Sequence, residues 1–437
     1  MALYHEQDMG KKSKNLKLTS IDLSEVHLSK QVVESLQDLV VSAKEGLLAL
    51  SVSVGLKVFQ ALMEEEVTEV VGPKGKHNPE RKAVRRGYEK GSVVLGGRKI
   101  QVNRPRVRTL DGRELLLQSY ILFQKEDPLT QIALERMLHG LSSRNYSYGL
   151  EPCGKELESK STSKSSISRR FIKLTRTALS ELLKRPLDNL DILVVFIDGV
   201  VVAEHTITVA LEVDAEGYKH ILGLAEGATE NAAVCRELLS DLVERGLNIE
   251  KGLLVVIDGS KALHRAVKDV FGEKALIQRC RVHKKKNLLD HLPKAEQGRV
   301  SRKLDQAWQE RDFYLARQKL ENLAKSLEKA YPGAAASIRE GLIETLTINK
   351  LGIPEVLQTS LKSTNIIESA FDITRNVARN VKRWRNGEQV LRWSAAGLMK
   401  AEERFRRIKG YRELPLLRGA LQRELNIDTN KKEVVSA

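Results

Sequence analysis

Cysteine and uninterrupted apolar runs are scarce in this sequence, and acidic residues are fewer than basic ones. Its 437 residues include three cysteines, too few for a disulfide framework in a chain of this size, which favours a reducing compartment. The N-terminus lacks the apolar core of a secretion signal, and the most apolar stretch, residues 47–63, is interrupted by Lys57 and by serines. We therefore interpret that stretch as a buried amphipathic helix and expect a cytoplasmic protein with no membrane span.

Because acidic residues are fewer than basic ones, the chain carries a large positive charge. There are 73 Lys and Arg against 57 Asp and Glu, so the net charge is +16. This excess indicates a polyanionic partner, because cations that neutralise phosphates release condensed counterions. The apolar fraction of 41% excludes a mainly disordered chain. A chain of this length has room for roughly two to four domains.

Residues 1–127 change from a helical pattern to a β pattern. In residues 1–75, apolar positions recur at helical spacing and stop at a loop of glycine and proline, which predicts a helical N-terminal region. Residues 76–127 are basic and contain two β-type runs around Gly96 and Gly97, which predict a hairpin. An exposed hairpin of that charge could lie on phosphates, and a solvated face without a partner is an equal alternative.

Residues 128–190 return to helical patterns, with a break of glycines and a proline near residue 150. Ser163 is suited to cap a helix that presents serines and cations. A short helix, a turn and such a second helix are typical of a helix-turn-helix that enters the major groove of DNA. A basic helical hairpin without a DNA partner is the alternative. The candidate DNA-binding residues of the second helix are Lys164, Ser165, Ser168, Arg169 and Lys173.

Residues 191–290 predict a sheet with helices between its later strands. Five apolar or β-type runs are separated first by a hairpin and then by two amphipathic helices. The order β-β-β-α-β-α-β matches a ribonuclease-H-like core, which has a mixed five-stranded sheet whose first three strands are antiparallel. The predicted strands are residues 192–198, 206–213, 219–224, 253–258 and 275–280.

The rest of the chain is predicted to be helical. Residues 291–360 are highly charged and almost wholly helical in pattern, which predicts an all-helical insertion interrupting the core. The core resumes in residues 361–412 with a helix over 364–382, and residues 413–437 form a tail without a recognisable motif. The sequence therefore predicts a multidomain α/β protein in which residues 191–290 and 361–412 are two parts of one catalytic core.

Two predicted strands end in an aspartate followed by glycine, at Asp198 and at Asp258. If these strands are neighbours, both carboxylates meet at the carboxyl edge of the sheet. Mg²⁺ takes oxygen ligands, and two ions about 3.5 to 4 Å apart can activate the attacking oxygen and stabilise the leaving oxygen in phosphoryl transfer. Glu368, on a predicted helix, is the candidate third carboxylate. Singly, each residue has an ordinary alternative, a turn for Asp-Gly and a helix surface for the glutamate.

These acids lie in segments that resemble the Mutator-type transposases of bacterial insertion sequences, over residues 80–400. The strongest matches are FIDGV at the first aspartate, VVIDGSKALHRAV at the second, QRCRVHKKKN after the fifth strand and STNIIESAFDITR around the glutamate. The resemblance implies a DDE transposase in which Asp198, Asp258 and Glu368 are the catalytic residues and the metal ligands. It also implies a helical insertion between the fifth strand and the glutamate.

A C-x-x-H motif, Cys280 and His283, lies between the second and third acids, as it does in this family. Zinc is an alternative, but no second paired motif supplies the remaining ligands of a tetrahedral site. The resemblance implies that the pair sits near the active site and helps to organise DNA, and a buried thiol with a phosphate-facing histidine is the other interpretation. Nearby cations, together with the family's basic residue after the glutamate, would hold the strand being cut. They are Arg279, Arg281, Lys284, Lys285, Lys286 and Arg375.

A second basic run, residues 375–412, has twelve Lys and Arg against three Glu and includes Trp384 and Trp393. Aromatic rings among cations can stack on unpaired bases at a distorted DNA end. The alternative is that both tryptophans anchor the terminal helices to the core.

The resemblance implies a reaction and its partners. Metal-dependent hydrolysis at the terminal inverted repeats of an insertion sequence would expose a 3′ hydroxyl, which then attacks target DNA. Two Mg²⁺ ions per site, with Mn²⁺ as a substitute, would be the cofactors, and double-stranded DNA would be the partner. Because two ends must be brought together, we expect a homodimer on DNA in the bacterial nucleoid. The alternatives are a catalytically silent DNA-binding regulator and a ribonuclease-H-like nuclease without strand transfer.

Overall fold

The computed structural model describes most of the chain in two compact units. The first unit comprises residues 1–130 and 149–162, and the second comprises 131–148 and 163–437. No helix among the described residues is long and apolar enough to cross a membrane. Ser163, the first helix of the predicted helix-turn-helix and the tail beyond residue 426 lie outside the described residues. The described residues are 47–76, 81, 83–95, 98–125, 138, 159–161, 164–229, 231–379, 381 and 383–426.

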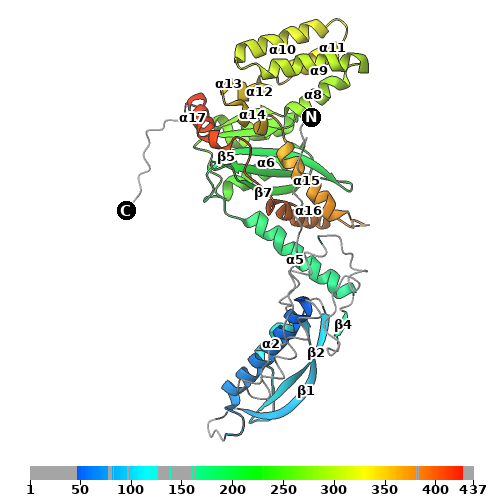
Figure 1. Ribbon diagram of the computed structural model, residues 1–437, viewed down its shortest axis with the longest axis vertical. Helices are drawn as coiled ribbons and strands as arrows, with labels where there is room; N and C mark the ends of the chain where they lie inside the picture. The colour runs from blue at the N-terminus through cyan, green and yellow to red at the C-terminus, as the bar shows by residue number, and fades with distance from the viewer. Residues whose placement is uncertain are drawn as a thin grey trace, which may run out of the picture. The chain divides into compact units, whose positions relative to one another are not determined.

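The first unit packs one long helix against a β-hairpin. Figure 1 shows α2 lying along the sheet formed by β1 and β2. Apolar residues spaced along α2, including Phe59 and Met63, are buried against Val93 and Ile100 of the hairpin. The elements are α2 (Leu47–Val71), β1 (Ala83–Leu95), β2 (Arg98–Thr109), β3 (Glu114–Leu115), α3 (Gln118–Lys125) and β4 (Ser159–Ser161), and the strands form one sheet in the order β1-β2-β3, with β4 on β2.

Several cations of the predicted basic hairpin are paired within this unit. Arg106 forms a two-point ion pair with Glu114, and Arg85 donates to Glu64 of α2 at 2.7 Å. These pairs satisfy part of the hairpin's charge internally. Contact between this hairpin and phosphates stays a prediction.

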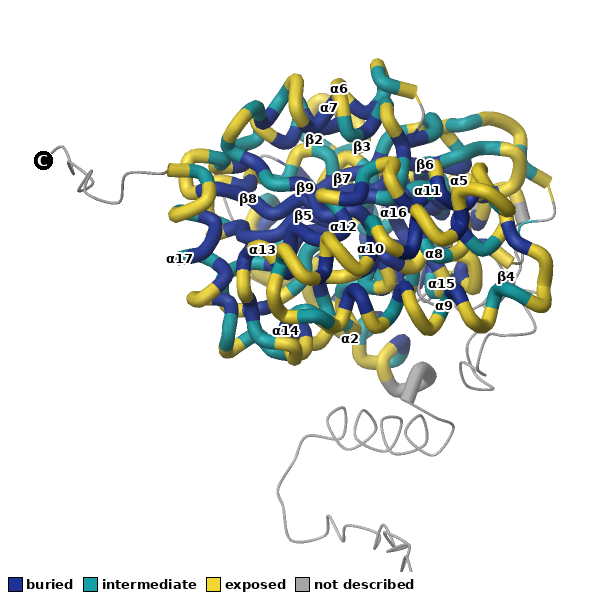
Figure 2. The backbone as a smooth tube through the Cα atoms, turned by 90° about the horizontal axis from the view of Figure 1, so that it is seen from above, coloured by how far each residue is buried: buried dark blue, intermediate teal, exposed yellow. Residues whose placement is uncertain are grey.

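The second unit is built on a mixed five-stranded sheet. Its strand order is β7-β6-β5-β8-β9, with β5, β6 and β7 antiparallel and with β8 and β9 parallel to β5. Figure 2 shows the backbone of β5 and β8 in dark blue, which marks buried residues. The strands are β5 (Ile192–Val202), β6 (His205–Asp214), β7 (Lys219–Glu226), β8 (Leu253–Ile257) and β9 (Ala275–Arg279).

Alternate residues of the central strands face two separate cores. Val194 and Phe196 lie in a core with residues of α15 and α16, whereas Val195 and Ile197 lie in a core with residues of α6 and α7. Because side chains of a strand alternate between the faces of its sheet, continuous apolar runs are what two covered faces require. The covering elements are α5 (Lys164–Lys184), α6 (Ala232–Glu244), α7 (Lys261–Phe271), η2 (Gly272–Lys274), α15 (Asn365–Ala378), α16 (Gly387–Glu402), η3 (Tyr411–Glu413) and α17 (Leu414–Glu424).

Between β9 and α15 every element is a helix. This helical segment has a core of its own, in which Leu288, Trp308 and Leu320 are buried together. Its helices are α8 (Arg281–Asp290), α9 (Lys294–Gln309), α10 (Phe313–Leu327), α11 (Pro332–Arg339), α12 (Leu342–Thr345), α13 (Thr347–Lys350) and α14 (Glu355–Leu361).

Among the element boundaries that differ from the sequence prediction, three lie close to the predicted site residues. β5 continues past Asp198 because β6 pairs with it as far as Val202 and His205, so the alternative of a turn at Asp198 is wrong. Cys280, predicted to end the fifth strand, is instead the N-cap of α8. The predicted helix over 364–382 ends at Ala378.

Candidate active site

Asp198 and Asp258 occupy matching positions on neighbouring strands. β5 and β8 are parallel, and their last paired residues are Ile197 and Ile257. Each aspartate directly follows one of these residues, so the two carboxylates lie side by side at the same level of the sheet. The Asp198 side chain is buried, with 6% of the residue exposed, whereas Asp258 is half-buried. The two strands are therefore neighbours, which is the condition on which the meeting of the two carboxylates depended.

Glu368 joins the site from α15, and His283 joins it from α8. One donor atom from each of Asp198, His283 and Glu368 lies within 4.8 Å of the other two. The His283 Nε2 is 3.9 Å from Glu368 Oε1. Figure 1 shows α15 packed against the sheet that carries β5. Three side chains from a strand and two helices therefore converge on one point.

The N-termini of α8 and α15 both point into this cluster. Glu368 lies in the first turn of α15, and His283 in the first turn of α8. The backbone N–H of Cys280 donates to Ile257 O at 2.7 Å, and that of Arg281 donates to Lys362 O at 2.9 Å. These bonds fix the start of α8 to β8 and to the residues before α15. Helix N-termini carry partial positive charge, which favours carboxylates and phosphates there.

Both aspartates have hydrogen-bond partners among threonines and a serine that the sequence analysis did not single out. The Thr229 hydroxyl donates to Asp258 Oδ2 at 3.2 Å, and the Ser260 N–H donates to Asp258 Oδ1 at 2.9 Å. The Thr364 side chain is fully buried and is a hydrogen-bond partner of Asp198. Its backbone N–H also lies 3.4 Å from the Cys280 sulfur. Thr364 falls inside the STNIIE segment around the glutamate, which was the only signal available in the sequence.

The cluster combines carboxylates with a histidine whose positive charge they favour. Burial raises the pKa of Asp198 to about 6, although Thr364 and His283 oppose this shift. The Cys280 thiol, followed by the charges of Asp198 and Glu368, raises the pKa of His283 to about 9 against the effect of burial. A buried carboxylate beside two other carboxylates is costly unless positive charge is present. Carboxylate oxygens are the ligands that Mg²⁺ and Mn²⁺ prefer, so the residues present fit a divalent-metal site.

Three of the six cations predicted to hold DNA beside this cluster are buried and bind protein groups. Arg281 donates to the carbonyls of Thr345 at 3.0 Å and Trp308 at 3.3 Å. Arg279 and Lys284 both donate to the Glu340 carbonyl. All three cations are less than a tenth exposed. Arg279 joins β9 to the helical segment, whereas Arg281 and Lys284 bind carbonyls within that segment. Their contact with DNA stays a prediction, and their burial leaves them little surface for it.

The remaining residues of this predicted group differ in accessibility. Cys280 is fully buried, so it is the buried thiol of the alternative interpretation and cannot touch DNA. Lys285 is 30% exposed and pairs with Asp305, whereas Arg375 is 54% exposed and pairs with Asp372. Lys286 is exposed. Lys285, Lys286 and Arg375 stay candidates for phosphate contacts.

The predicted recognition helix and the two tryptophans meet on the same face of the sheet. Ser165, Ser168, Arg169 and Lys173 are exposed on α5, as a DNA-binding surface requires, and their contact with DNA stays a prediction. The side chain of Lys164 lies outside the described residues. Phe171 on the opposite side of α5 contacts Trp393 with ring centroids 4.6 Å apart, and Trp393 contacts Trp384 at 6.4 Å. Both tryptophans are half-buried, which favours the alternative that they anchor helices.

Comparisons with known proteins agree on one family. The model of a family described as "Transposase, Mutator family" matches residues 23–407. Similar proteins include the transposase for insertion sequence element ISRM5 of Rhizobium meliloti (strain 1021), which is 28% identical over 368 residues, covering 83% of this chain and 90% of the relative. The transposase for IS905 of Lactococcus lactis subsp. lactis is 27% identical over 291 residues, covering 65% of this chain and 70% of that protein. The transposase for IST2 of Acidithiobacillus ferrooxidans is 30% identical over 197 residues, covering 45% and 65%.

Proposed function

Because this chain belongs to the Mutator family of transposases, we propose that it cuts the ends of an insertion sequence and joins them to target DNA at the Asp198 cluster. The observation that carries the proposal is the meeting of Asp198 and Glu368 beside Asp258. These residues are separated by 60 to 170 positions, roughly, yet they converge at one edge of a sheet. Carboxylates repel one another, so surface acids without a common partner have no physical reason to gather beside a buried one.

We also propose that the sheet is a ribonuclease-H-like core and that the helical segment is an insertion into it. The strand order β7-β6-β5-β8-β9, with three antiparallel strands followed by two parallel ones, supports this assignment. The helices α8 to α14 lie between β9 and the helix that carries the third acid. In this arrangement the inserted segment leaves and returns beside the catalytic cluster.

In the proposed mechanism Asp198, Asp258 and Glu368 would hold two Mg²⁺ ions, with Mn²⁺ as a substitute. Such a pair of ions supplies activation of the attacking oxygen and stabilisation of the leaving oxygen. Thr364 orients Asp198, while Thr229 and Ser260 orient Asp258. His283 lies beside Glu368, where its positive charge would offset a developing negative charge on the phosphate.

Lys285, Lys286 and Arg375 would position phosphates of the strand being cut, and exposed residues of α5 would contact the terminal repeat. Water attacks in the cleavage step, and the 3′ hydroxyl so exposed attacks target DNA in the joining step. In cleavage a P–O bond to the water oxygen forms as the P–O3′ bond breaks, which leaves a 3′ hydroxyl and a 5′ phosphate. In joining, a new phosphodiester bond to the 3′ oxygen forms as a P–O3′ bond of the target breaks, which releases a 3′ hydroxyl of the target. We further propose a homodimer that brings two element ends together.

The proposal is tested by incubating the protein with DNA fragments that carry the element's own ends and with supercoiled target DNA. With Mg²⁺ we expect both nicks at the ends and joined products, and with EDTA we expect neither. Cleavage without joined products would indicate a nuclease instead. Binding without cleavage in either Mg²⁺ or Mn²⁺ would indicate a silent DNA-binding regulator.

Thr364 provides a test of how the site is oriented. Replacing Thr364 by Val removes the hydroxyl and keeps the shape, so we expect kcat for cleavage to fall by about 10- to 100-fold, as for other groups that orient metal ligands. Thr364→Ser keeps the hydroxyl and is expected to restore most of this rate. Equal rates for the Val and Ser variants would show that the hydroxyl does not orient Asp198.

A further inference from the structure

The basic segment after α16 is not a loose charged run, because it is seated on the core. Ile408 is buried, and its N–H donates to Gly217 O in the turn between β6 and β7 at 3.0 Å. The Ser360 hydroxyl of α14 donates to Lys409 O at 3.0 Å. Residues from three distant parts of the chain therefore fix the path of this segment.

Two glycines allow this close seating. Gly217 has φ +87°, and a Cβ placed there would lie 2.4 Å from Tyr411 Cβ. Gly410 has φ +77°, and a Cβ there would lie 2.7 Å from the backbone of Leu357. Both positions require glycine for backbone conformation and for space. The segment thus has a built geometry that a solvated charge run would not need.

Seated in this way, the segment presents five exposed cations within nine residues, which we call the 404–412 surface. None of the five forms an ion pair with another described residue, whereas the adjacent Glu403 is paired with Lys400 at 2.7 Å. The cations are Arg404, Arg406, Arg407, Lys409 and Arg412. Such a concentration of unpaired positive charge matches a polyanion.

Two tyrosines hold the guanidinium of Arg407 in place, and this arrangement indicates which part of DNA the surface would contact. The Arg407 guanidinium lies 4.3 Å from the ring centre of Tyr218 and 4.9 Å from that of Tyr411, and it donates to the Tyr218 hydroxyl at 2.7 Å. Because Arg407 already occupies ring faces of both tyrosines, those faces are not free to stack on bases. The surface is therefore suited to the phosphates of a duplex rather than to unpaired bases.

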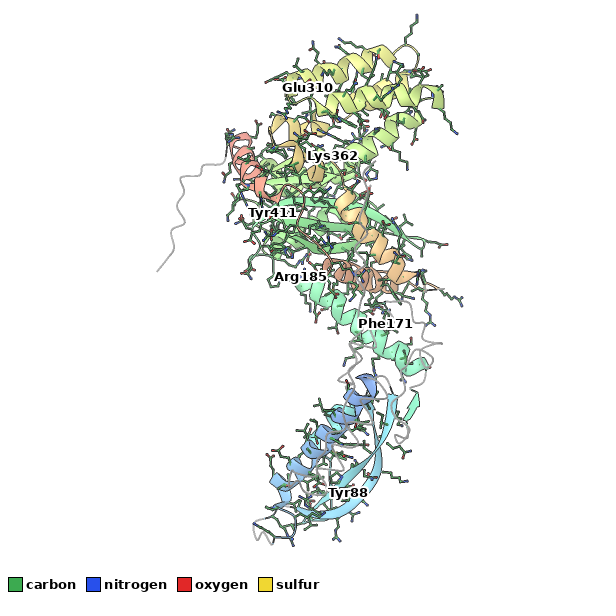
Figure 3. All side chains as sticks on the ribbon, in the orientation of Figure 1. Tyr88, Phe171, Arg185, Glu310, Lys362 and Tyr411 are labelled. Atoms are coloured by element: carbon green, nitrogen blue, oxygen red, sulfur yellow. The ribbon has the colours of Figure 1, made fainter. Side chains whose placement is uncertain are left out.

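The 404–412 surface lies away from the catalytic cluster. The turn that seats Ile408 follows Asp214, and Asp214 pairs with Ile192 at the start of β5, six residues before Asp198. At about 3.3 Å per residue, the turn and Asp198 are separated by about 20 Å along the strand. Figures 1 and 3 show Tyr411 and α17 at one end of the sheet and α15 displaced from them.

We propose that the 404–412 surface binds the phosphate backbone of duplex DNA at a distance from the bond that is cut. The proposal rests on the proposed function for its partner, since a transposase must hold duplex on either side of a scissile phosphate. It adds a further contact region, separate from the cluster and from the exposed residues of α5. An ordered array of cations binds with a smaller entropy cost than a flexible tail of equal charge.

The test compares two full-length variants that each remove three exposed cations. One carries Arg404→Gln, Arg406→Gln and Lys409→Gln in the surface, and the matched control carries Arg302→Gln, Lys303→Gln and Lys329→Gln in the helical segment. Arg407 and Arg412 are left in place because both stack on Tyr411. Affinity for a mixed-sequence duplex of about 40 base pairs is measured across a range of salt concentrations.

We expect the surface variant to bind at least about tenfold more weakly, with its salt slope reduced by about 2.7, or about 0.9 for each lost phosphate contact. The control variant, which has the same net charge, is expected to change its slope by less than about 1. Arg404→Lys, Arg406→Lys and Lys409→Arg together should bind as the wild type does.

Equal losses in the surface and control variants would overturn the proposal, because only net charge would then matter. An unchanged affinity in the surface variant would overturn it as well. These measurements need no cleavage, so they show whether the 404–412 surface binds DNA even if the protein does not cut DNA. Conversely, if the wild-type protein binds duplex through this surface but never cuts DNA, the proposal for the 404–412 surface stands and only the proposed function is contradicted.

Discussion

Replacing Asp198, Asp258 or Glu368 by its amide is expected to reduce DNA cleavage by at least about 1,000-fold while DNA binding survives. Asn and Gln keep the shape of the side chain but remove the negative charge that holds a divalent cation. Asp198 and Glu368 meet in one cluster with His283, and Asp258 follows the neighbouring strand beside Asp198, so we expect each of the three substitutions to disturb the same site. Cleavage is measured on end-bearing fragments, and binding on the same fragments by a mobility shift.

Asp372→Asn is the matched control for these variants. Asp372 lies one turn beyond Glu368 on α15, but its side chain is 72% exposed and pairs with Arg375. We expect the Asp372 variant to cleave within about threefold of the wild type, since exposed ion pairs contribute little. If a variant of the triad cleaves at the wild-type rate, its carboxylate is not a metal ligand.

Thermal melting gives a readout of the same site without cleavage. Mg²⁺ that binds only the folded protein should raise the melting temperature of the wild type. The Asp198→Asn protein should lack this rise. Without added metal its melting temperature should equal or exceed that of the wild type, because burial raises the pKa of Asp198 to about 6 and makes its charge costly. A rise of equal size in both proteins would place the metal elsewhere.

Replacing Arg281 by Ala is expected to lower the free energy of unfolding by about 3 kcal/mol. The guanidinium donates to the carbonyls of Thr345 and Trp308 and to the side chain of Asn349, and it stacks beside the Trp308 ring with 5.6 Å between centres. Removing it takes one donor from each of these buried acceptors and leaves a cavity, although Gln278 still donates to the Thr345 carbonyl and Asn349 to the Trp308 carbonyl. Urea denaturation followed by tryptophan fluorescence measures the loss.

Lys286→Ala is the control for Arg281, because it removes an exposed cation from the same helix. Its effect on stability should stay within about 0.5 kcal/mol. Arg281→Lys should recover only part of the lost stability, since lysine cannot reproduce the planar donors of arginine. An Arg281→Ala protein of wild-type stability that binds DNA poorly would support the sequence-based prediction that Arg281 contacts DNA.

The contrast between Glu368 and Arg281 shows which features a sequence can reveal. Buried strands, the helix around Glu368 and the matching positions of the two aspartates follow from local patterns, because strand length and side-chain alternation repeat over a few residues. The run QRCRVHKKKN reads as a block of positive charge. Nothing local indicates that Arg281 binds residues 64 and 68 positions away, whereas Lys286 faces solvent.

The sequence by itself determined the family, the order of the strands and the acids that approach one another, because each depends on local pattern or on motifs. Only the tertiary structure decided which cations are free. Arg279, Arg281 and Lys284 are buried against backbone carbonyls, and His283 lies beside Glu368. Residues 404–412 are fixed on the core as an exposed basic surface. The sequence gives the sign of a charged side chain but not the groups that surround it in the fold. Partners from distant segments determine whether that side chain stabilises the fold or remains available to DNA.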